Sequence, residues 1–473
     1  MASIAMARLI GNAEHISDAA NNSESYRVLR GRVSVLKIAP DARFMPYLEL
    51  AGFGSVALIR SSDLQFDLLF ALVERWRPET HTFHFPCGEC TVTLEDVAVQ
   101  LGLPVGGSPV TGLSSLTDPA AVCYQLLGES PWDGDKFFSV LKFTWLRAKI
   151  CRLSMTASEG ELMCAARAYI MHMIGALLMP DVNGDSVHLS YLPLLADLST
   201  ARSYSWGSAV LATLYKELCR AVDPQVKDIG GCLILLQSWA LYRMPFLARV
   251  SHQPYLYPLP LRWTTRPGIR KSSDVPIYRM RIEQHAREGF IWMPYRRPEI
   301  ANVVPPFALV DSHTWCTNTP IINFNIIEWY HGDRVLRQFG CIQPIPDPPC
   351  QLREDHGLTK RGRVQLDWGI YHRKYVALWY DRMSRIPQMV MATDLQPSRE
   401  YTEWYHSRGK PYLLGAQSTI IPPYVQQVRE SEADSTMDPD PTAFCLAEQA
   451  EPGQSEPNEE SHGYHPDLLG GEH

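Results

Sequence analysis

Three long apolar segments in the middle of the chain constrain its fold more than any other feature. They cover residues 159–179, 207–221 and 231–242, and each has the length and composition of a helix packed on most of its surface. The third holds the longest apolar run, which is too short to span a bilayer and contains Gln237. We therefore expect a mainly α fold built on buried helices, with no membrane span.

The other segments predict further helices and a few strands. Apolar residues at helical spacing predict a helix over 62–76. We also expect a shorter helix over 277–287, an aromatic-faced helix over 367–385 and a strand over 289–294. The apolar run 321–330 fits either a strand or a helix, because it is too short to define a period.

The segment 81–93 predicts a β-hairpin that leads into a helix. Its first residues alternate between aromatic and polar side chains, as in a strand with one packed face. A turn containing Pro and Gly follows, and the next residues return as a second strand. Thr93 and Asp96 have the spacing of a capping box, which predicts a helix that ends near Gly102.

The charge of the chain is divided between a body and a tail. Residues 430–473 hold twelve acidic side chains and no Lys or Arg, which leaves 44 basic and 39 acidic residues in the rest of the 473-residue chain. The tail is also rich in Pro, Glu and Ser, a composition typical of disorder. We expect a poorly ordered lead over 1–41, one large folded domain over 42–415 and a disordered acidic tail over 416–473.

The cysteine content indicates a reducing environment. Eleven cysteines are scattered along the chain, an odd number that does not suggest a disulfide framework in a protein with a large core. The first residues lack the long apolar run of a signal peptide. We therefore expect an intracellular protein.

Two histidines and two cysteines in the hairpin segment, His81, His84, Cys87 and Cys90, follow one another at a uniform spacing of three. These are ligand types that zinc prefers. On a strand, however, His81 and His84 point to opposite faces, and only the two cysteines have the spacing of a zinc knuckle. Because no second knuckle appears elsewhere, we expect packed side chains around a turn and no bound metal. A zinc site and a redox-active cysteine pair are the alternatives.

No catalytic motif stands out in the sequence. A phosphate-binding loop, a dinucleotide fingerprint, a nucleophile elbow and a zinc-protease motif are all missing. The run HGDRV at 331–335 resembles part of a metallophosphatase motif, but the other metal-binding motifs of that class are missing. Isolated polar residues such as Asp197, Asp311 and His372 are expected to be structural. We therefore expect no enzyme activity, no catalytic residue and no cofactor.

The aromatic segment 367–385 has two interpretations. Its Trp and Tyr residues lie near Arg373, Lys374, Arg382 and Arg385, a combination that could stack on bases and contact phosphates. The same pattern is typical of an amphipathic helix that buries its rings and leaves its charges in water. The body carries about five net positive charges, which permits an acidic partner without requiring one.

Six motifs are similar to the signature of the plant mobile domain family. They occur in the order of the family, over about residues 42–415, and the first and third are long and specific. The motifs are RWRPETHTFHFPCGECTVTLEDVAVQLGLPVGG at 75–107, DSVHLSYLPLLADL at 185–198, YSWGSAVLATLYKELCRA at 204–221, GCLILLQSWALYRMP at 231–245, VLRQFGCIQPIP at 335–346 and YTEWYHSRG at 401–409.

The resemblance implies a plant protein of the maintenance-of-meristems-like group, whose relatives occur as host genes and within transposable elements. It implies roles in meristem maintenance, transposon silencing and nuclear gene expression, and it offers no catalytic residue. One relative joins the domain to a serine/threonine phosphatase, and others carry the label aminotransferase-like. This chain lacks the phosphatase motifs and the lysine setting of a pyridoxal enzyme, so neither name implies activity. Relatives often have Met at the position of Cys90, which removes one supposed zinc ligand.

Together these features favour a large helical plant mobile domain with a few short β-hairpins and disordered termini. We expect a non-enzymatic interaction module in the nucleus, with nuclear protein partners that include a phosphatase-type protein. The alternatives are a nucleic-acid-binding protein derived from a transposable element and a cryptic enzyme.

Overall fold

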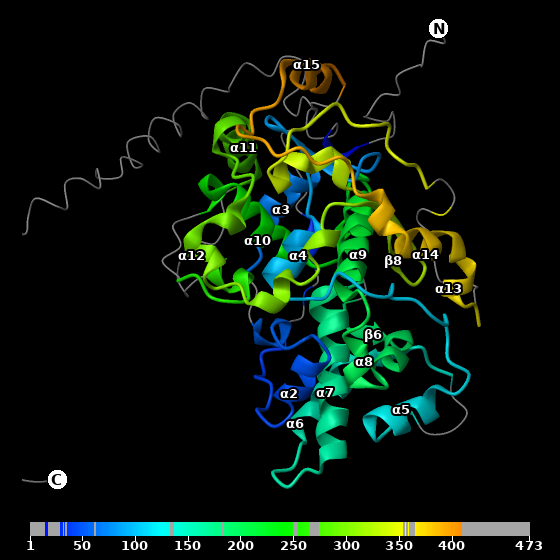
Figure 1. Cartoon of the computed structure of the whole chain (residues 1–473). Coiled ribbons are helices and arrows are strands. Elements are labelled where there is room, and N and C mark those ends of the chain that lie inside the picture. The colour runs from blue at the N-terminus through cyan, green and yellow to red at the C-terminus, as the bar shows by residue number, and fades with distance from the viewer. Residues whose placement is uncertain are drawn as a thin grey trace, which may run out of the picture. The chain divides into compact units, whose positions relative to one another are not determined.

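The computed structural model of the chain describes residues 15–17, 29–31, 33, 36–60, 63–132, 137–181, 184–248, 254–263, 274–352, 355, 358 and 365–408. In these residues the fold is mainly α with several short strands, as the sequence predicts (Figure 1). The predicted tail over 416–473 lies outside the described residues, as does most of the lead over 1–41. The described part of the lead includes Ile16, Leu29 and Leu36, which are buried in the main core. Side chains from before residue 42 thus contribute to that core.

The described helices range from one to four turns. The α-helices are α2 (Met45–Leu50), α3 (Phe66–Val73), α4 (Leu94–Leu101), α5 (Pro119–Leu127), α6 (Phe143–Cys151), α7 (Glu159–Met173), α8 (Leu198–Ala201), α9 (Trp206–Ala221), α10 (Leu233–Arg243), α11 (Val275–Gly289), α12 (Pro298–Ala301), α13 (Trp368–Tyr371), α14 (Arg373–Tyr380) and α15 (Arg399–Arg408). The 3-10 and π turns are η1 (Val56–Leu58), η2 (Ile174–Leu178), η3 (Leu189–Leu195), η4 (Pro245–Leu247), η5 (Leu259–Trp263), η6 (Pro294–Arg296), η7 (Pro306–Leu309), η8 (Ser312–Thr314), η9 (Gly332–Phe339) and η11 (Arg382–Arg385).

The strands of the described residues are short and form four small sheets. They are β1 (Arg30–Gly31), β2 (Trp76–Arg77), β3 (Thr82–Phe85), β4 (Gly88–Cys90), β5 (Val140–Lys142), β6 (Ser186–His188), β7 (Asp228–Ile229), β8 (Asn318–Asn323) and β9 (Ile326–His331). The order β2-β3-β4 makes an antiparallel three-stranded sheet, and β8 pairs with β9 over six residues each. β5 pairs antiparallel with β6, whereas β1 and β7 are parallel.

The central helix α9 organises the body. Most of its side chains are buried because it contacts α4 along one side and the β8–β9 hairpin along another. Figure 1 shows α9 between α4 and α10 on the left and β8 on the right. The predicted segments 159–179, 207–221 and 231–242 are all helical, as α7 with η2, α9 and α10. This confirms the buried helices that the sequence predicts.

The predicted hairpin and its following helix are also confirmed. Phe83 of β3 packs its ring 5.1 Å from that of Trp239 in α10, and this contact anchors the apolar face of the hairpin. The amide of Asp96 donates to the Thr93 hydroxyl, and the amide of Thr93 donates to the Asp96 carboxylate, which completes the capping box of α4. Gly102 ends this helix with a φ of 71°, a conformation that glycine adopts without strain.

Three predicted elements differ in the structure. The helix expected over 62–76 ends at Val73, because Trp76 leaves it to pair with Phe83 in the β2–β3 sheet. The strand expected over 289–294 does not form, since Ile291 bonds to the end of α10 rather than to a strand. The helix expected over 367–385 is divided into α13, α14 and η11.

One helix among the described residues is long and apolar enough to cross a membrane by length and composition alone. It is the continuous segment Glu159–Leu178, formed by α7 and η2. Of its most apolar window, 78% is buried by other parts of the body. Such burial is typical of a core helix.

Candidate functional site

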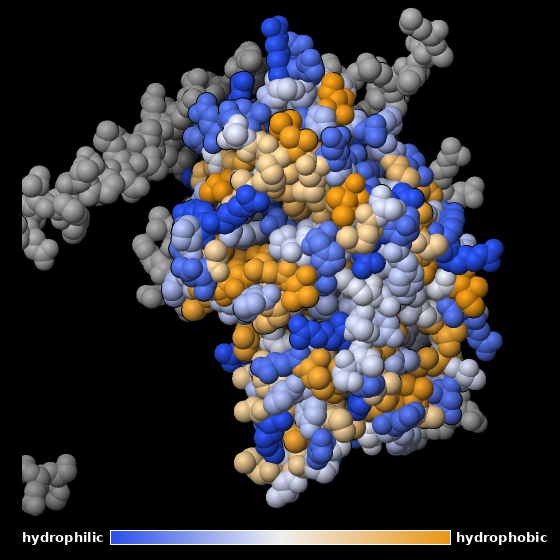
Figure 2. All heavy atoms as spheres, viewed as in Figure 1, coloured by the Kyte–Doolittle hydropathy of each residue, from blue (hydrophilic) through white to orange (hydrophobic). Residues whose placement is uncertain are grey.

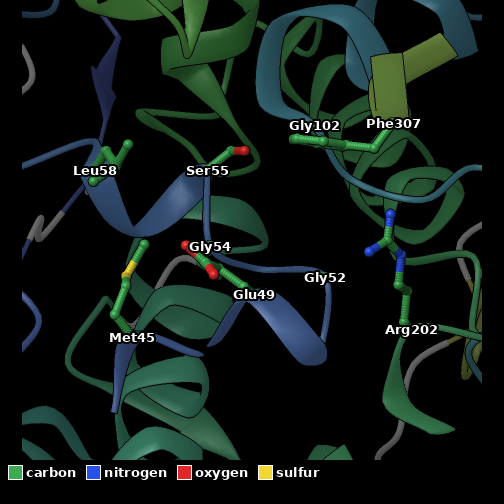
Figure 3. A pocket seen from close by; sticks show the side chains of 9 residues that line it. All are labelled: Met45, Glu49, Gly52, Gly54, Ser55, Leu58, Gly102, Arg202 and Phe307. Carbon is green, nitrogen blue, oxygen red and sulfur yellow. The ribbon is translucent and has the colours of Figure 1, made fainter. Parts of the chain in front are cut away.

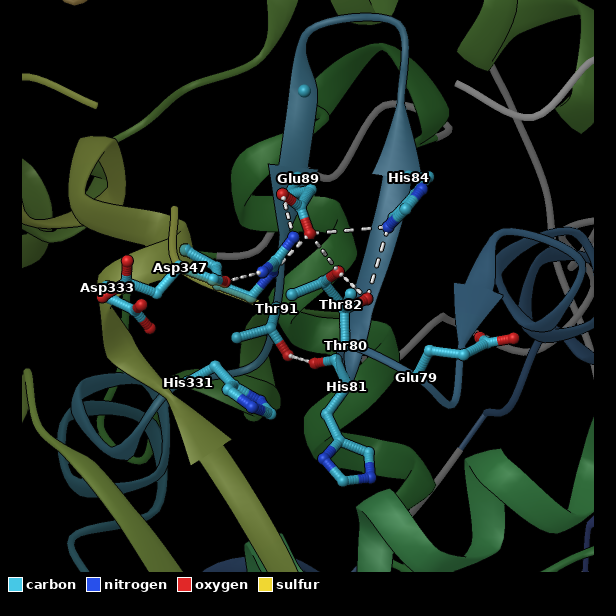
Figure 4. Close-up of polar contacts among 12 residues, drawn as sticks. Glu79, Thr80, His81, Thr82, His84, Glu89, Thr91, His331, Asp333 and Asp347 are labelled. Atoms are coloured by element: carbon cyan, nitrogen blue, oxygen red, sulfur yellow. Dashed lines mark hydrogen bonds and ion pairs between the residues drawn. The ribbon is translucent and has the colours of Figure 1, made fainter. Parts of the chain in front are cut away.

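The four residues singled out in the hairpin segment do not form one site. Cys87 lies in the turn of the hairpin and Cys90 ends β4 opposite Phe83, whereas His81 precedes β3. Figure 4 shows the ring of His81 pointing away from His84. Among the described residues, the His, Cys and acidic donors that gather within 4.8 Å of one another are those of His81, Cys219 and Glu328. The two histidines thus point apart as predicted, but His81 precedes the strand on which the sequence placed it.

His84 faces a buried ion pair that the sequence analysis missed. Arg334 of η9 binds Glu89 of β4 through two bonds, Nε to Oε1 at 2.8 Å and Nη2 to Oε2 at 3.0 Å (Figure 4). The hydroxyl of Thr82 donates to the same carboxylate at 3.0 Å, and His84 Nε2 lies 3.5 Å from it. The hairpin register pairs His84 with Glu89, so this one contact was available from the sequence.

The ion pair is electrostatically strong. Burial raises the pKa of the Glu89 carboxyl, but the Arg334 guanidinium and the hydrogen bond from His84 outweigh it and hold the pKa at about 2. The side chains of Glu89 and Arg334 are at most 1% exposed. A carboxylate in this setting is locked to its partner, so it is suited to holding structure and not to exchanging protons.

Arg334 also fastens a surface segment. Its Nη1 donates to the backbone carbonyl of Asp347 at 2.9 Å. Asp347 belongs to residues 342–350, a Pro-rich extended segment that we call the strap. The buried side chain of Gln343 accepts from Leu336 N and donates to the Asp333 carbonyl, both at 2.8 Å. The strap is therefore tied to η9 at several points.

The outer side of the strap is apolar. The amide of Ile342 donates to the carbonyl of Val390 at 2.8 Å, which places residues 386–391 beside the strap. Six apolar side chains of the two segments are 38–60% exposed, and we call this set the apolar strip. Figure 2 shows that hydrophobic side chains also gather in separate patches among hydrophilic ones on the face drawn there. The apolar strip consists of Ile342, Ile345, Ile386, Met389, Val390 and Met391.

The two hairpin cysteines are enclosed by the body. Cys90 is fully buried and Cys87 is 8% exposed. Arg337 donates to the carbonyl of Cys87 at 2.6 Å and stacks on Trp292 with 3.9 Å between guanidinium and ring. Burial raises the pKa of the Cys90 thiol. The pair is thus part of the packing that joins the hairpin to η9.

Charged side chains line two of the cavities among the described residues. The first, of about 290 Å³, lies beside α2 and carries Glu49 and Arg202 at opposite sides (Figure 3). The second, of about 210 Å³, is lined by Asp181 and Glu217 together with the buried amide of Asn323. Glu217 in the second cavity already accepts from the Arg220 guanidinium at 2.7 Å and from the Gly230 amide at 2.9 Å.

The aromatic segment buries the rings that would stack on bases. Trp368 and Trp379 are fully buried, which confirms the packing interpretation for both. Lys374 binds Asp355 at 2.7 Å, and Arg382 lies 4.5 Å from the Trp379 ring. Exposed aromatic surface remains at other positions of this segment, such as Tyr380, which is 58% exposed.

Isolated polar residues that the sequence left open have structural partners. Asp197 caps α8 by accepting from Ser199 N at 2.8 Å. Asp311 accepts from the Gly106 amide at 3.0 Å. His372 is 1% exposed.

Comparison with known proteins points to one family. The chain matches the family model described as plant mobile domain over residues 52–406. It is 37% identical over 377 residues to the Serine/threonine-protein phosphatase 7 long form homolog of Arabidopsis thaliana, which covers 76% of this chain and 28% of that protein. It is 38% identical over 303 residues to Protein MAIN-LIKE 1 (63% of this chain, 58% of the relative), and 33% identical over 351 residues to Protein MAINTENANCE OF MERISTEMS (72% of each), both from Arabidopsis thaliana.

The chain thus spans less than two thirds of the length of the first two relatives. No solved structure matches it.

Proposed function

The chain belongs to the plant mobile domain family, and from this premise we propose that it is a non-enzymatic protein-interaction module of the maintenance-of-meristems-like type. It acts in the nucleus, in meristem maintenance and in transposon silencing or gene expression. Its partner is a phosphatase-type protein, which it recruits through the apolar strip.

The observation that carries this proposal is the apolar strip on its fixed support. A group of exposed apolar side chains on a folded domain is a common mark of a protein interface. Here the backbone beneath it is held by Gln343 and Arg334, so little conformational entropy is lost when a partner binds. Methionines at its edge let the surface adapt to the partner.

Two buried ion pairs support a scaffold role. They are Glu89 with Arg334 and Asp96 with Arg243. Catalytic acids and bases need pKa values near the working pH, whereas the Glu89 carboxyl is held at a pKa of about 2. These groups position the hairpin and the strap.

A binding assay with defined components tests the proposal. The full chain is immobilised, and binding of the purified Arabidopsis phosphatase 7 long form homolog is measured by biolayer interferometry. We expect the double variant Val390→Asp with Met391→Asp to weaken binding at least about tenfold, because two buried charges would be left unpaired at the interface. Met155→Asp is the matched control, since Met155 is 87% exposed and outside the strip. Equal binding by both variants, or no binding by the wild-type chain, would contradict the proposal.

A nucleic-acid-binding function is the alternative, supported by exposed Tyr371 and Tyr380 near Arg373. It requires binding that weakens steeply with salt, with a logarithmic slope of about −0.9 per phosphate contact on duplex DNA. A mobility shift measured across a salt series decides it. We expect no salt-dependent shift, and a steep slope would favour this function over the recruitment of a protein.

A further inference from the structure

We propose that His81, Cys219 and Glu328 bind one zinc ion inside the body. The three residues come from separate parts of the fold: the turn before β3, the helix α9 and the strand β9. One nitrogen, one sulfur and one oxygen atom of these side chains lie within 4.8 Å of one another. This ligand set shares one histidine with the hairpin pattern but neither of its cysteines.

The ring of His81 has the orientation of a metal ligand. Its Nδ1 lies 2.8 Å from the carbonyl of Trp329, and because a carbonyl only accepts, Nδ1 carries a proton. Metal-binding histidines usually fix their second nitrogen in this way. The other nitrogen, Nε2, then faces Glu328 Oε2 at 3.0 Å. A cation or a proton has to lie between these two atoms.

The backbone and the neighbouring rings hold this orientation. His81 has a φ of 52°, a left-handed conformation that costs energy in residues other than glycine. Its ring stacks on that of Tyr215 in α9 at 5.4 Å. Backbone strain at a residue whose ring is packed this closely fits a position selected for what the side chain binds.

The sulfur of Cys219 is oriented in a corresponding way. The indole Nε1 of Trp76 donates to Cys219 Sγ at 3.3 Å, so the sulfur acts as an acceptor, as a metal-bound thiolate does. A divalent ion would bind the thiolate, and the thiol proton would be released to solvent.

The chemistry of the set selects zinc. A thiolate, a carboxylate and a neutral imidazole carry two negative charges, which balance a divalent ion in the buried interior. Mixed nitrogen, sulfur and oxygen ligands suit zinc, whereas calcium and magnesium require oxygen alone. Zinc bonds of about 2.0–2.3 Å place tetrahedral donors roughly 3.3–3.8 Å apart, so the side chains need only small shifts. The fourth position is left to water.

The test uses the full purified chain, loaded with zinc or cobalt and washed with a weak chelator. We expect about one metal ion per chain by mass spectrometry of the metal, and a thiolate-to-cobalt charge-transfer band in the cobalt form. Cys219→Ser should abolish the band and Glu328→Gln should weaken metal binding at least about tenfold. Cys123→Ser, which removes another buried thiol, should leave both unchanged.

Two further measurements keep the result decisive. The Cys87→Ser variant should retain the charge-transfer band. If Cys87→Ser lost the band and Cys219→Ser kept it, the metal would belong to the hairpin cysteines and the proposal would be overturned. X-ray absorption at the zinc edge of the wild-type chain needs no variant, and we expect a single sulfur among the ligands. A folded chain that takes up neither zinc nor cobalt would show that His81 and Glu328 share a proton as an ordinary ion pair.

Discussion

Several charged side chains in the described interior have partners of opposite charge. The guanidinium of Arg334 spans Glu89, and that of Arg243 reaches Asp96 at 2.8 Å with both side chains fully buried. Such a pair contributes little net stability over an apolar pair, but removing one partner leaves an isolated buried charge. Replacing one partner of such a pair should therefore lower the free energy of unfolding far more than replacing both partners together.

Arg334→Met tests this asymmetry. We predict a loss of about 3–5 kcal/mol in the free energy of unfolding at pH 7, because Glu89 would stay buried without its cation. Adding Glu89→Gln should restore part of the loss. Lys142→Met is the control, since Lys142 and Asp185 form an exposed pair whose loss should cost at most about 1 kcal/mol. Urea unfolding measures all four chains, and a loss no larger than that of the control would refute the argument.

Glu95 gives a prediction for pH. Burial and the neighbouring Asp96 carboxylate raise the pKa of the Glu95 carboxyl to about 8. The folded state therefore holds this proton more tightly than the unfolded state, whose pKa is about 4.3. The stability it contributes is present below that value and is lost as the pH rises through about 8. Glu95→Gln should match the wild type at pH 4 and be more stable at pH 8. The free energy of unfolding of both proteins is measured from pH 4 to pH 8. A constant difference between wild type and variant over this range would rule out the raised pKa.

The site residues show what residue spacing could and could not predict. His81 and His84 point apart as predicted, although His81 precedes β3 instead of lying on it. The hairpin register alone places Glu89 opposite His84. Arg334 and Glu328, in contrast, come from the β9–η9 region, and no local pattern links that region to the hairpin. Contacts of this kind depend on tertiary packing, which one sequence does not reveal.

At the scale of elements, local signals predict helices well where nothing competes with them. Thr93 and Asp96 specify the start of α4, and the structure has the predicted capping box. The helix expected over 62–76 was overridden at its end by pairing of Trp76 with Phe83, a contact that buries both rings. The ambiguous run 321–330 became the β8–β9 hairpin, which packs on α9.

Two capping boxes permit a matched comparison. Thr93 caps the buried start of α4, and Ser158 caps the exposed start of α7. An N-cap substitution by Ala costs about 0.5–2 kcal/mol. We predict that Thr93→Ala lies at the upper end of this range and Ser158→Ala at the lower end, because Asp96 also holds Arg243. Chemical unfolding of the two variants measures the difference. Equal losses in the free energy of unfolding would show that the other contacts of Asp96 add nothing to the capping of α4.

The strap depends on Gln343. Its replacement by Leu removes the bonds to Leu336 N and to the Asp333 carbonyl and should cost about 1–3 kcal/mol. We predict faster amide exchange in residues 342–350 with unchanged helical circular dichroism, together with weaker partner binding. The control is Gln351→Leu, the same replacement at an exposed glutamine. Unchanged exchange in the strap would show that other contacts hold it.

At the scale of the whole molecule, the interior of the described body holds the structure together and its surface is proposed to bind a partner. Inside, aromatic rings and paired charges connect the hairpin, α9 and η9. Outside, the apolar strip is carried on a strap that these same interior groups hold in place, through Arg334 and its bond to Asp347. The interior thus determines the shape of the surface that meets a partner.

Hydrogen–deuterium exchange of the full chain, measured alone and with the Arabidopsis phosphatase 7 long form homolog, tests this division most directly. The account predicts that binding slows exchange in residues 342–350 and 386–391 and leaves the buried hairpin at 81–93 unchanged. Protection confined to other surfaces, or no protection anywhere in the chain, would contradict it.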